Sequence, residues 1–70
     1  MDTVEIGKRI AVARINQGIR SGAALAREIG VTKKTVLFWE TGKCTPRYSM
    51  LEVLSKRLNV SQQWILFGEQ

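Results

Sequence analysis

The chain contains no histidine and only one cysteine, Cys44, among its 70 residues. A lone cysteine excludes an intrachain disulfide, and without histidine no Cys/His cluster can hold a metal ion. The carboxylates do not fall in a pattern that suggests a catalytic dyad. We therefore expect a protein that is not an enzyme and that uses no metal, no cofactor and no small-molecule substrate.

Long hydrophobic runs are also missing. No unbroken apolar run exceeds four residues, whereas a membrane-spanning helix needs about 20. The chain does not begin with the charged, apolar and cleavage segments of a secretory signal. We therefore expect no membrane contact and a cytoplasmic location. The sequence has no strand pattern, internal repeat or low-complexity stretch either. We therefore expect a fold made of helices.

Helical spacing of apolar residues predicts an all-α bundle of five helices in a single domain, residues 1–70. Asp2 or Thr3 is a suitable N-cap for the first helix, and Ser21, Thr32 and Ser61 are suitable N-caps for later ones. Pro46 suits the first position of the fourth helix, with Thr45 as its cap. The expected helices run to about Gln17, over Gly22–Ile29 and Lys33–Thr41, from Pro46 to about Leu58, and through Phe67.

The stretch 22–41 reads as two short helices joined by a tight corner. Gly30 stands where the first of them must end, because the residue after a helix often needs a positive φ. Small and apolar side chains repeat on one face of each helix, so these faces should pack together. The pattern predicts a helix-turn-helix. The residues expected to face inward are Leu25, Ala26, Ile29, Val36, Trp39 and Glu40.

The opposite face of the second of these helices carries lysines beside large apolar side chains. Such a face suits the major groove of DNA, where lysines bind guanine O6/N7 or phosphate and apolar groups meet thymine methyls. In the alternative, Leu37 and Phe38 pack on another helix or in a subunit contact. The face comprises Lys33, Lys34, Leu37, Phe38 and Thr41.

Positive charge is concentrated in the middle of the chain. Residues 8–47 hold nine basic residues against two acidic ones, a balance of +7, while the whole chain has a net charge of +5. A basic centre with neutral or acidic flanks favours binding to a polyanion. The alternative is a basic surface that is merely solvated.

The joint pattern resembles the lambda-repressor-like helix-turn-helix domains of phage repressors and Cro proteins, over about residues 6–68. One departure concerns the first position of the second helix, where the family usually has Gln and this chain has Gly22. The matching elements are Gly7-x-Arg9-Ile10-x-x-x-Arg14, Leu25-Ala26-x-x-Ile29-Gly30-Val31-Thr32-x-x-x-Val36-x-x-Trp39-Glu40-x-Gly42-Lys43, Pro46, Leu51-x-x-Leu54-x-x-x-Leu58-Asn59-Val60-Ser61 and Trp64-Ile65-Leu66-x-Gly68.

The resemblance implies a sequence-specific regulator of transcription, a repressor or Cro-like protein, that binds a two-fold double-stranded DNA operator as a dimer. It implies base contacts from Lys33, Lys34, Leu37 and Phe38, and a paired, largely buried Arg14 and Glu40 rather than two unrelated surface charges. The implied phosphate contacts are Ser21, Gly22, Ala23, Thr41, Lys43, Cys44, Thr45 and Arg14.

The resemblance also places a dimer contact at the fifth helix and the turn before it. Trp64–Phe67 cannot all face one core, so we expect Ile65 and a neighbour to be exposed; alternatively, all four cover the core. The implied dimer residues are Arg47, Gln62, Ile65 and Phe67. A small apolar contact implies a homodimer that is weak without DNA. The alternative function is a protein–protein module of the same fold, an antitoxin or adaptor.

Overall fold

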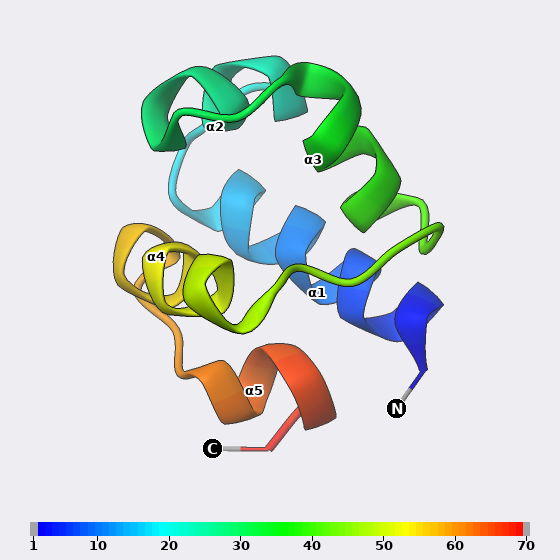
Figure 1. The fold of residues 1–70 in the computed structure, drawn as a ribbon. Coiled ribbons are helices and arrows are strands. Elements are labelled where there is room, and N and C mark those ends of the chain that lie inside the picture. Colours follow the sequence, from blue (N-terminus) through cyan, green and yellow to red (C-terminus); the bar gives the residue numbers. More distant parts are fainter. Residues whose placement is uncertain (1, 70) are drawn as a thin grey trace.

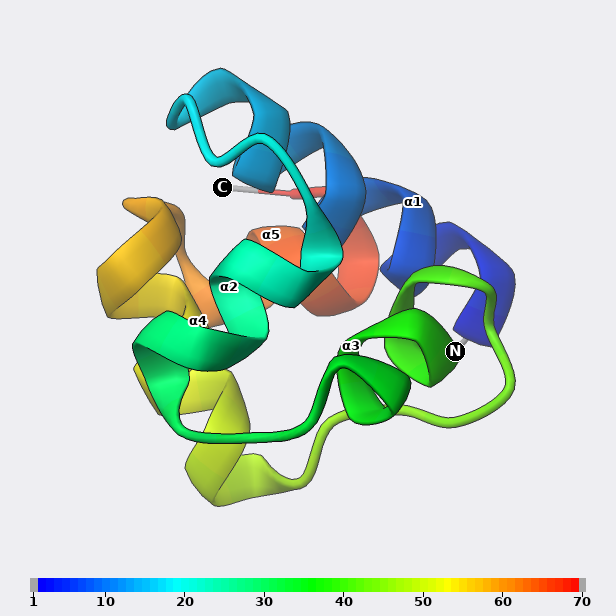
Figure 2. The ribbon, with the colours of Figure 1, turned by 90° about the horizontal axis from the view of Figure 1, so that it is seen from above.

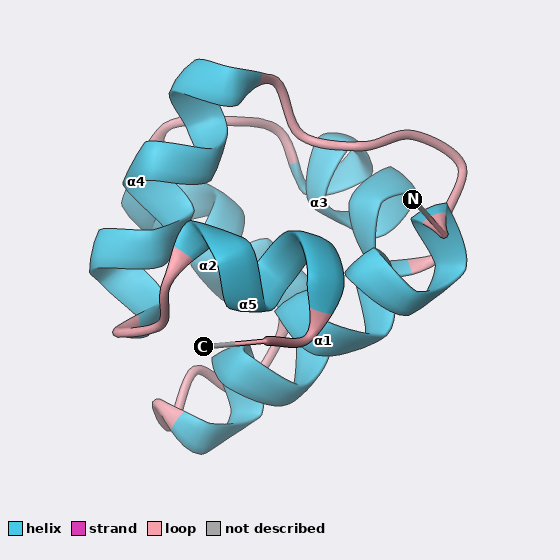
Figure 3. Ribbon diagram, turned by 90° about the horizontal axis from the view of Figure 1, so that it is seen from below, coloured by secondary structure: helices cyan, strands magenta, loops and turns pink. Residues whose placement is uncertain are grey.

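The computed structural model describes residues 2–69, and all regular structure in that range is helical. The link between α3 and α4, residues 41–47, is the longest, and the other links between the helices are shorter (Figure 3). The all-α expectation is therefore confirmed. The five helices are α1 (Thr3–Asn16), α2 (Gly22–Ile29), α3 (Lys33–Glu40), α4 (Tyr48–Leu58) and α5 (Gln62–Phe67).

Helix α1 passes through the middle of the molecule (Figure 1). It packs against α3 on one side and α5 on the other. Ile6, Ile10 and Ala13 of α1 are all buried, as their i, i+4, i+7 spacing requires. Ile15, the next apolar residue, is 62% exposed and does not extend this buried stripe. The remaining core residues are Ile19, Leu25, Ala26, Val36, Trp39, Leu51, Leu54, Leu58 and Ile65.

Side-chain caps set the beginnings of four helices: three are the residues predicted, and the fourth, Asp2, is one of the two candidates for α1. Asp2 accepts hydrogen bonds from the amides of Val4 and Glu5. Ser21, Thr32 and Ser61 each accept from the amide three residues further on. These bonds satisfy backbone donors that the first turn of a helix leaves unpaired.

Pro46 and Thr45 do not begin α4 as its first residue and its cap, contrary to the prediction. The helix starts at Tyr48, its N-cap is Arg47, and no side chain caps it. Pro46 is buried, and the chain is still extended at Arg47, which has φ −65° and ψ 159°. Tyr48 itself is 80% exposed.

The α2–turn–α3 unit has the predicted geometry. Gly30 adopts φ 80°, and its amide donates to the carbonyl of Ala26. Val31 follows it and packs against the core. Seen from above, α2 and α3 lie side by side on one surface of the molecule (Figure 2). The chain therefore forms a helix-turn-helix whose second helix, α3, has one face directed away from the core.

Candidate nucleic-acid interface

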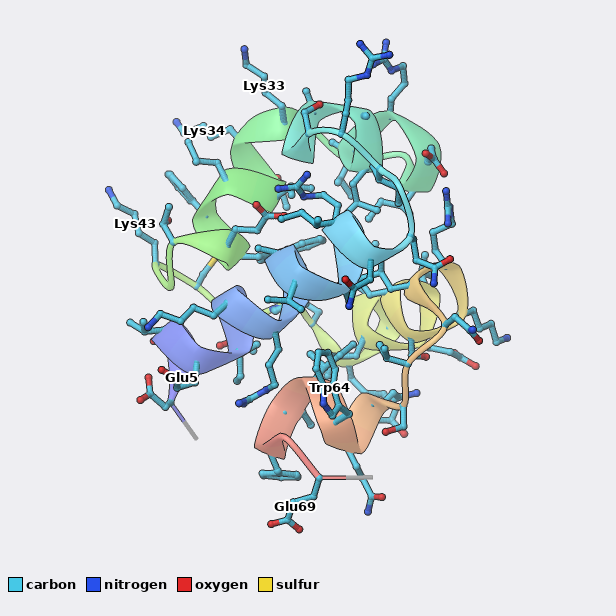
Figure 4. All side chains as sticks on the ribbon, turned by 180° about the vertical axis from the view of Figure 1, so that it is seen from behind. Glu5, Lys33, Lys34, Lys43, Trp64 and Glu69 are labelled. Atoms are coloured by element: carbon cyan, nitrogen blue, oxygen red, sulfur yellow. The ribbon has the colours of Figure 1, made fainter. Side chains whose placement is uncertain are left out.

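The outer face of α3 is formed by the predicted residues. Val36 and Trp39 are buried at 0% and 4% exposure, whereas Leu37 is 56% exposed. We call the face formed by Lys33, Lys34, Leu37, Phe38 and Thr41 the recognition face. All of these residues are exposed except Phe38, which is half-buried. Figure 4 shows Lys33 and Lys34 extending from the same side of the molecule as Lys43.

An ion pair fixes α3 to α1. The Arg14 Nε donates to Glu40 Oε2 at 2.8 Å, and a second guanidinium nitrogen donates to Glu40 Oε1 at 3.4 Å. A third nitrogen donates to the carbonyl of Ile19 at 2.9 Å. The two side chains are only 11% and 15% exposed. The geometry matches the paired, largely buried arrangement expected, and it holds α3 at a set distance from α1.

The ion pairs also leave the helix-turn-helix strongly positive. Both acidic residues of the segment 20–47 are paired with arginines from outside it: Glu40 with Arg14 of α1, and Glu28 with Arg57 of α4. Among the described residues, none of the six cations of this segment has a carboxylate within 4.0 Å. These cations are Arg20, Arg27, Lys33, Lys34, Lys43 and Arg47. The two carboxylates, which would repel DNA, are thus neutralised by arginines from outside the segment. The six cations of the segment, which would attract DNA, are not used for this.

A hollow of about 240 Å³ lies where the start of α2 meets α3. Gly22 brings the start of α2 close to α3: a Cβ there would sit 3.2 Å from Val36 Cγ1 and 3.9 Å from Glu40 Oε1. Lys33 stands at its rim. The lining residues are Gly22, Ala23, Lys33, Leu37 and Glu40.

The residues expected to contact phosphate lie on both flanks of α3. Gly22 and Ala23 line the hollow beside the start of α2. Cys44 and Thr45 line a second hollow of about 340 Å³, together with Thr35 and Trp39 of α3. Two hydroxyls are already used within the protein: Ser21 Oγ accepts from Ala24 N at 3.0 Å, and Thr41 Oγ1 donates to the Leu37 carbonyl at 2.7 Å. Lys43 is exposed, and Arg14 is bound to Glu40.

The expectation that Ile65 is exposed is wrong. Its side chain is fully buried, at 0% exposure, in the core. Helix α5 is only six residues long, and its register is set by the face that covers α1 and α4. Phe67 is 56% exposed, and Gln62 is half-buried. Arg47 lies elsewhere, beside Thr35 and Met50 at the second hollow.

Two long-range contacts that support this arrangement were not predicted. The Arg9 guanidinium donates to the carbonyls of Ile65 and Leu66 at 2.8 and 3.0 Å, and so satisfies the end of α5. The Glu28–Arg57 pair joins α2 to α4. The partners are 56 and 29 residues apart, and no local spacing signals such pairs. In the part of the chain that the structure describes, no group of three or more metal-ligating side chains gathers, and no helix could cross a membrane.

The fold and the exposed helix α3, held by the Arg14–Glu40 pair, define a helix-turn-helix protein. Comparison with known sequences gives the same class. Residues 10–65 match the family model described as helix-turn-helix, and the chain belongs to the lambda-repressor-like helix-turn-helix family. It is 37% identical over 65 residues to the HTH-type transcriptional regulator DicA of Escherichia coli (strain K12). That alignment covers 93% of this chain and 47% of DicA, so the chain spans about half the length of this relative. No solved structure gave a significant match.

Proposed function

We propose that this chain is a sequence-specific DNA-binding regulator of transcription, of repressor or Cro-like type. The observation that carries the proposal is the recognition face. It is an exposed helical surface with two lysines, held to α1 by the Arg14–Glu40 pair and surrounded by cations that have no carboxylate within 4.0 Å among residues 2–69. The helix-turn-helix family and the transcriptional regulator among its relatives support the same proposal.

In the proposed complex, α3 lies in the major groove, which is about 12 Å wide and admits one α-helix. Leu37 and the two lysines of the recognition face are exposed and able to reach base edges. The amides at the start of α2, beside Gly22 and Ala23, approach a phosphate from one side of the groove. The loop that carries Lys43 approaches the backbone from the other side.

We further propose that two copies bind a two-fold operator, with half-sites about 34–36 Å apart. Phe67 is the exposed apolar side chain of α5 and the best candidate for the contact between the copies. A contact this small suits a homodimer that forms fully only on DNA, where the first copy raises the effective concentration of the second. Occupation of the operator then excludes RNA polymerase.

Selection of binding sites from a pool of random duplexes, followed by a salt titration, tests the proposal. We expect an enriched palindromic sequence, and a log–log slope of affinity against salt near −0.9 per phosphate neutralised. A protein–protein module, the alternative suggested by the exposed Leu37 and Phe67, would bind through apolar contacts that barely respond to salt. Failure to bind any duplex at low ionic strength would refute DNA binding.

Lysine substitutions then separate affinity from specificity. Lys33→Ala or Lys34→Ala should weaken binding to the selected sequence, because each removes a positive charge from the recognition face. A lysine that reads a base should also relax the preference at one position by about 1–3 kcal/mol. A lysine that binds phosphate should weaken binding to all sequences alike.

A further inference from the structure

Two lysines from different segments converge on the ring of Phe38. The Nζ atom of Lys34, in the first turn of α3, lies 5.5 Å from the ring centroid. The Nζ atom of Lys43, in the loop after α3, lies 5.3 Å from it. Both distances fall within the range of about 6 Å in which an ammonium group is attracted by the negative face of an aromatic ring. Phe38 is thus a common support for one lysine of the helix and one of the loop.

Backbone geometry brings both lysines to this ring. Lys34 and Phe38 are four residues apart on one helix and therefore lie on the same face. Gly42, with φ 83°, ends α3 in the left-handed conformation. Its amide donates to the Trp39 carbonyl at 3.1 Å, and the Lys43 amide donates to the Phe38 carbonyl at 2.9 Å. This is a Schellman motif, in which the side chains at positions 38 and 43 characteristically come into contact.

The two flanks of α3 therefore differ in whether their lysines contact Phe38. Lys33 stands beside the hollow that contains Gly22, on the flank opposite the second hollow. No cation–π contact to Phe38 involves Lys33 among the described residues. Lys34 and Lys43 are exposed, and neither has a carboxylate partner in the part of the chain that the structure describes. Both ammonium groups can therefore bind an external anion without breaking an ion pair.

We propose that Phe38 is a positioning residue that presents Lys34 and Lys43 as one pair of charges to the sugar–phosphate backbone at the edge of the groove. The proposal rests on the proposed DNA binding. It assigns Phe38 a role other than contact with a thymine methyl, and it assigns Lys34 to a phosphate rather than to a base edge. The ring restricts the rotamers of two long side chains before DNA arrives, so less conformational entropy is lost on binding. Its contribution is to affinity for any sequence, and base readout falls to Lys33 and Leu37.

A double-mutant cycle tests this coupling. Affinity for a random-sequence duplex and for the selected operator is measured with Phe38→Leu, Lys43→Met and the double variant. We expect Phe38→Leu to weaken binding to both duplexes by about 2- to 5-fold, the size of an exposed cation–π contact. Lys43→Met should then cost measurably less in the Phe38→Leu background. Lys33→Met is the matched control, and its cost should be the same with either residue at position 38.

Two further measurements separate positioning from general structural damage. Phe38→Tyr keeps the ring and should retain affinity within about twofold, whereas pentafluorophenylalanine at position 38 keeps its shape, reverses its quadrupole and should behave like Phe38→Leu. In the free protein, the ε-methylene protons of Lys34 and Lys43 should show ring-current shifts that Phe38→Leu abolishes. This NMR readout needs no DNA.

The outcomes distinguish the two proposals. If the wild-type protein binds duplexes with strong salt dependence but the Phe38–Lys43 cycle is additive, the positioning role is overturned and DNA binding stands. The same holds if Phe38→Leu leaves random-sequence affinity unchanged and alters the preference at one A·T pair, because Phe38 would then read a base. If the wild-type protein binds no duplex at low salt, the proposed function itself fails.

Discussion

Gly7 of α1 lies directly against the main chain of Trp39 in α3. A Cβ atom at position 7 would come within 2.3 Å of the Trp39 carbonyl oxygen and 2.8 Å of the Glu40 carbonyl oxygen. Both obstacles are backbone atoms of the recognition helix and cannot turn aside as a flexible side chain would. The contact therefore sets how closely α1 supports α3, about two turns of α1 before Arg14, which binds Glu40.

Gly7→Ala should therefore be among the most damaging small substitutions in the chain. We expect it to lower the free energy of unfolding by about 3 kcal/mol or more, at the upper end of the cost of overpacking. Gly18→Ala is the control, because position 18 has φ 76° and no atom within 4 Å of the added Cβ. It should cost only about 1–2 kcal/mol, for its left-handed backbone. Urea denaturation measures both, and equal costs would contradict the proximity argument.

The Arg14–Glu40 pair should contribute far more to stability than a surface pair. We expect Glu40→Gln to lower the free energy of unfolding by about 1.5–3 kcal/mol, since it removes charged hydrogen bonds from a largely buried site. Glu52→Gln provides the comparison, because its pair with Lys56 is 60% and 78% exposed. That change should cost less than about 0.5 kcal/mol. Thermal unfolding gives the melting temperatures of the two variants. Similar melting temperatures would show that the buried pair stabilises the fold no more than the surface pair does.

The hollow beside Gly22 should govern base preference. Gly22→Gln introduces an amide next to Lys33 and should change the preferred base at the outer end of each half-site, as measured by selection from random duplexes. Gly22→Ala adds only a Cβ, 3.2 Å from Val36 Cγ1, which requires a shift of a few tenths of an ångström. It should leave the preference unchanged. Identical profiles for the two variants would mean that the side chain at position 22 does not reach the DNA.

The buried and exposed apolar residues of α5 should separate folding from self-association. Ile65→Ala should destabilise the monomer by about 2–5 kcal/mol, because Ile65 is fully buried. Phe67→Ser, at a residue that is 56% exposed, should change stability by no more than about 0.5 kcal/mol and should raise the dimer dissociation constant. Analytical ultracentrifugation, with and without operator DNA, measures the dimer dissociation constant. An unchanged dissociation constant for Phe67→Ser would remove α5 from the proposed dimer contact.

The sequence by itself determined the helices, most of their caps and the face that α3 exposes. These features follow from local rules: a hydroxyl or carboxylate that reaches an amide two or three residues away, a glycine after a helix, and a 3.6-residue period. Ser21, Gly30 and Thr32 therefore predict the helix-turn-helix from local sequence alone, without the packing of the other helices. The Arg14–Glu40 pair was expected only because the chain resembles a family in which those positions are paired.

Tertiary structure alone decided the features that depend on how helices approach one another. Four consecutive apolar residues, Trp64–Phe67, carry no periodic signal, and only packing on α1 and α4 turns Ile65 inward. Pro46 is buried, and α4 starts at Tyr48 rather than at Pro46. The contacts of Arg9 with the end of α5 and of Glu28 with Arg57 join residues distant in sequence. Such contacts arise from the relative positions of whole helices, which the burial of one shared core sets and which no local pattern encodes.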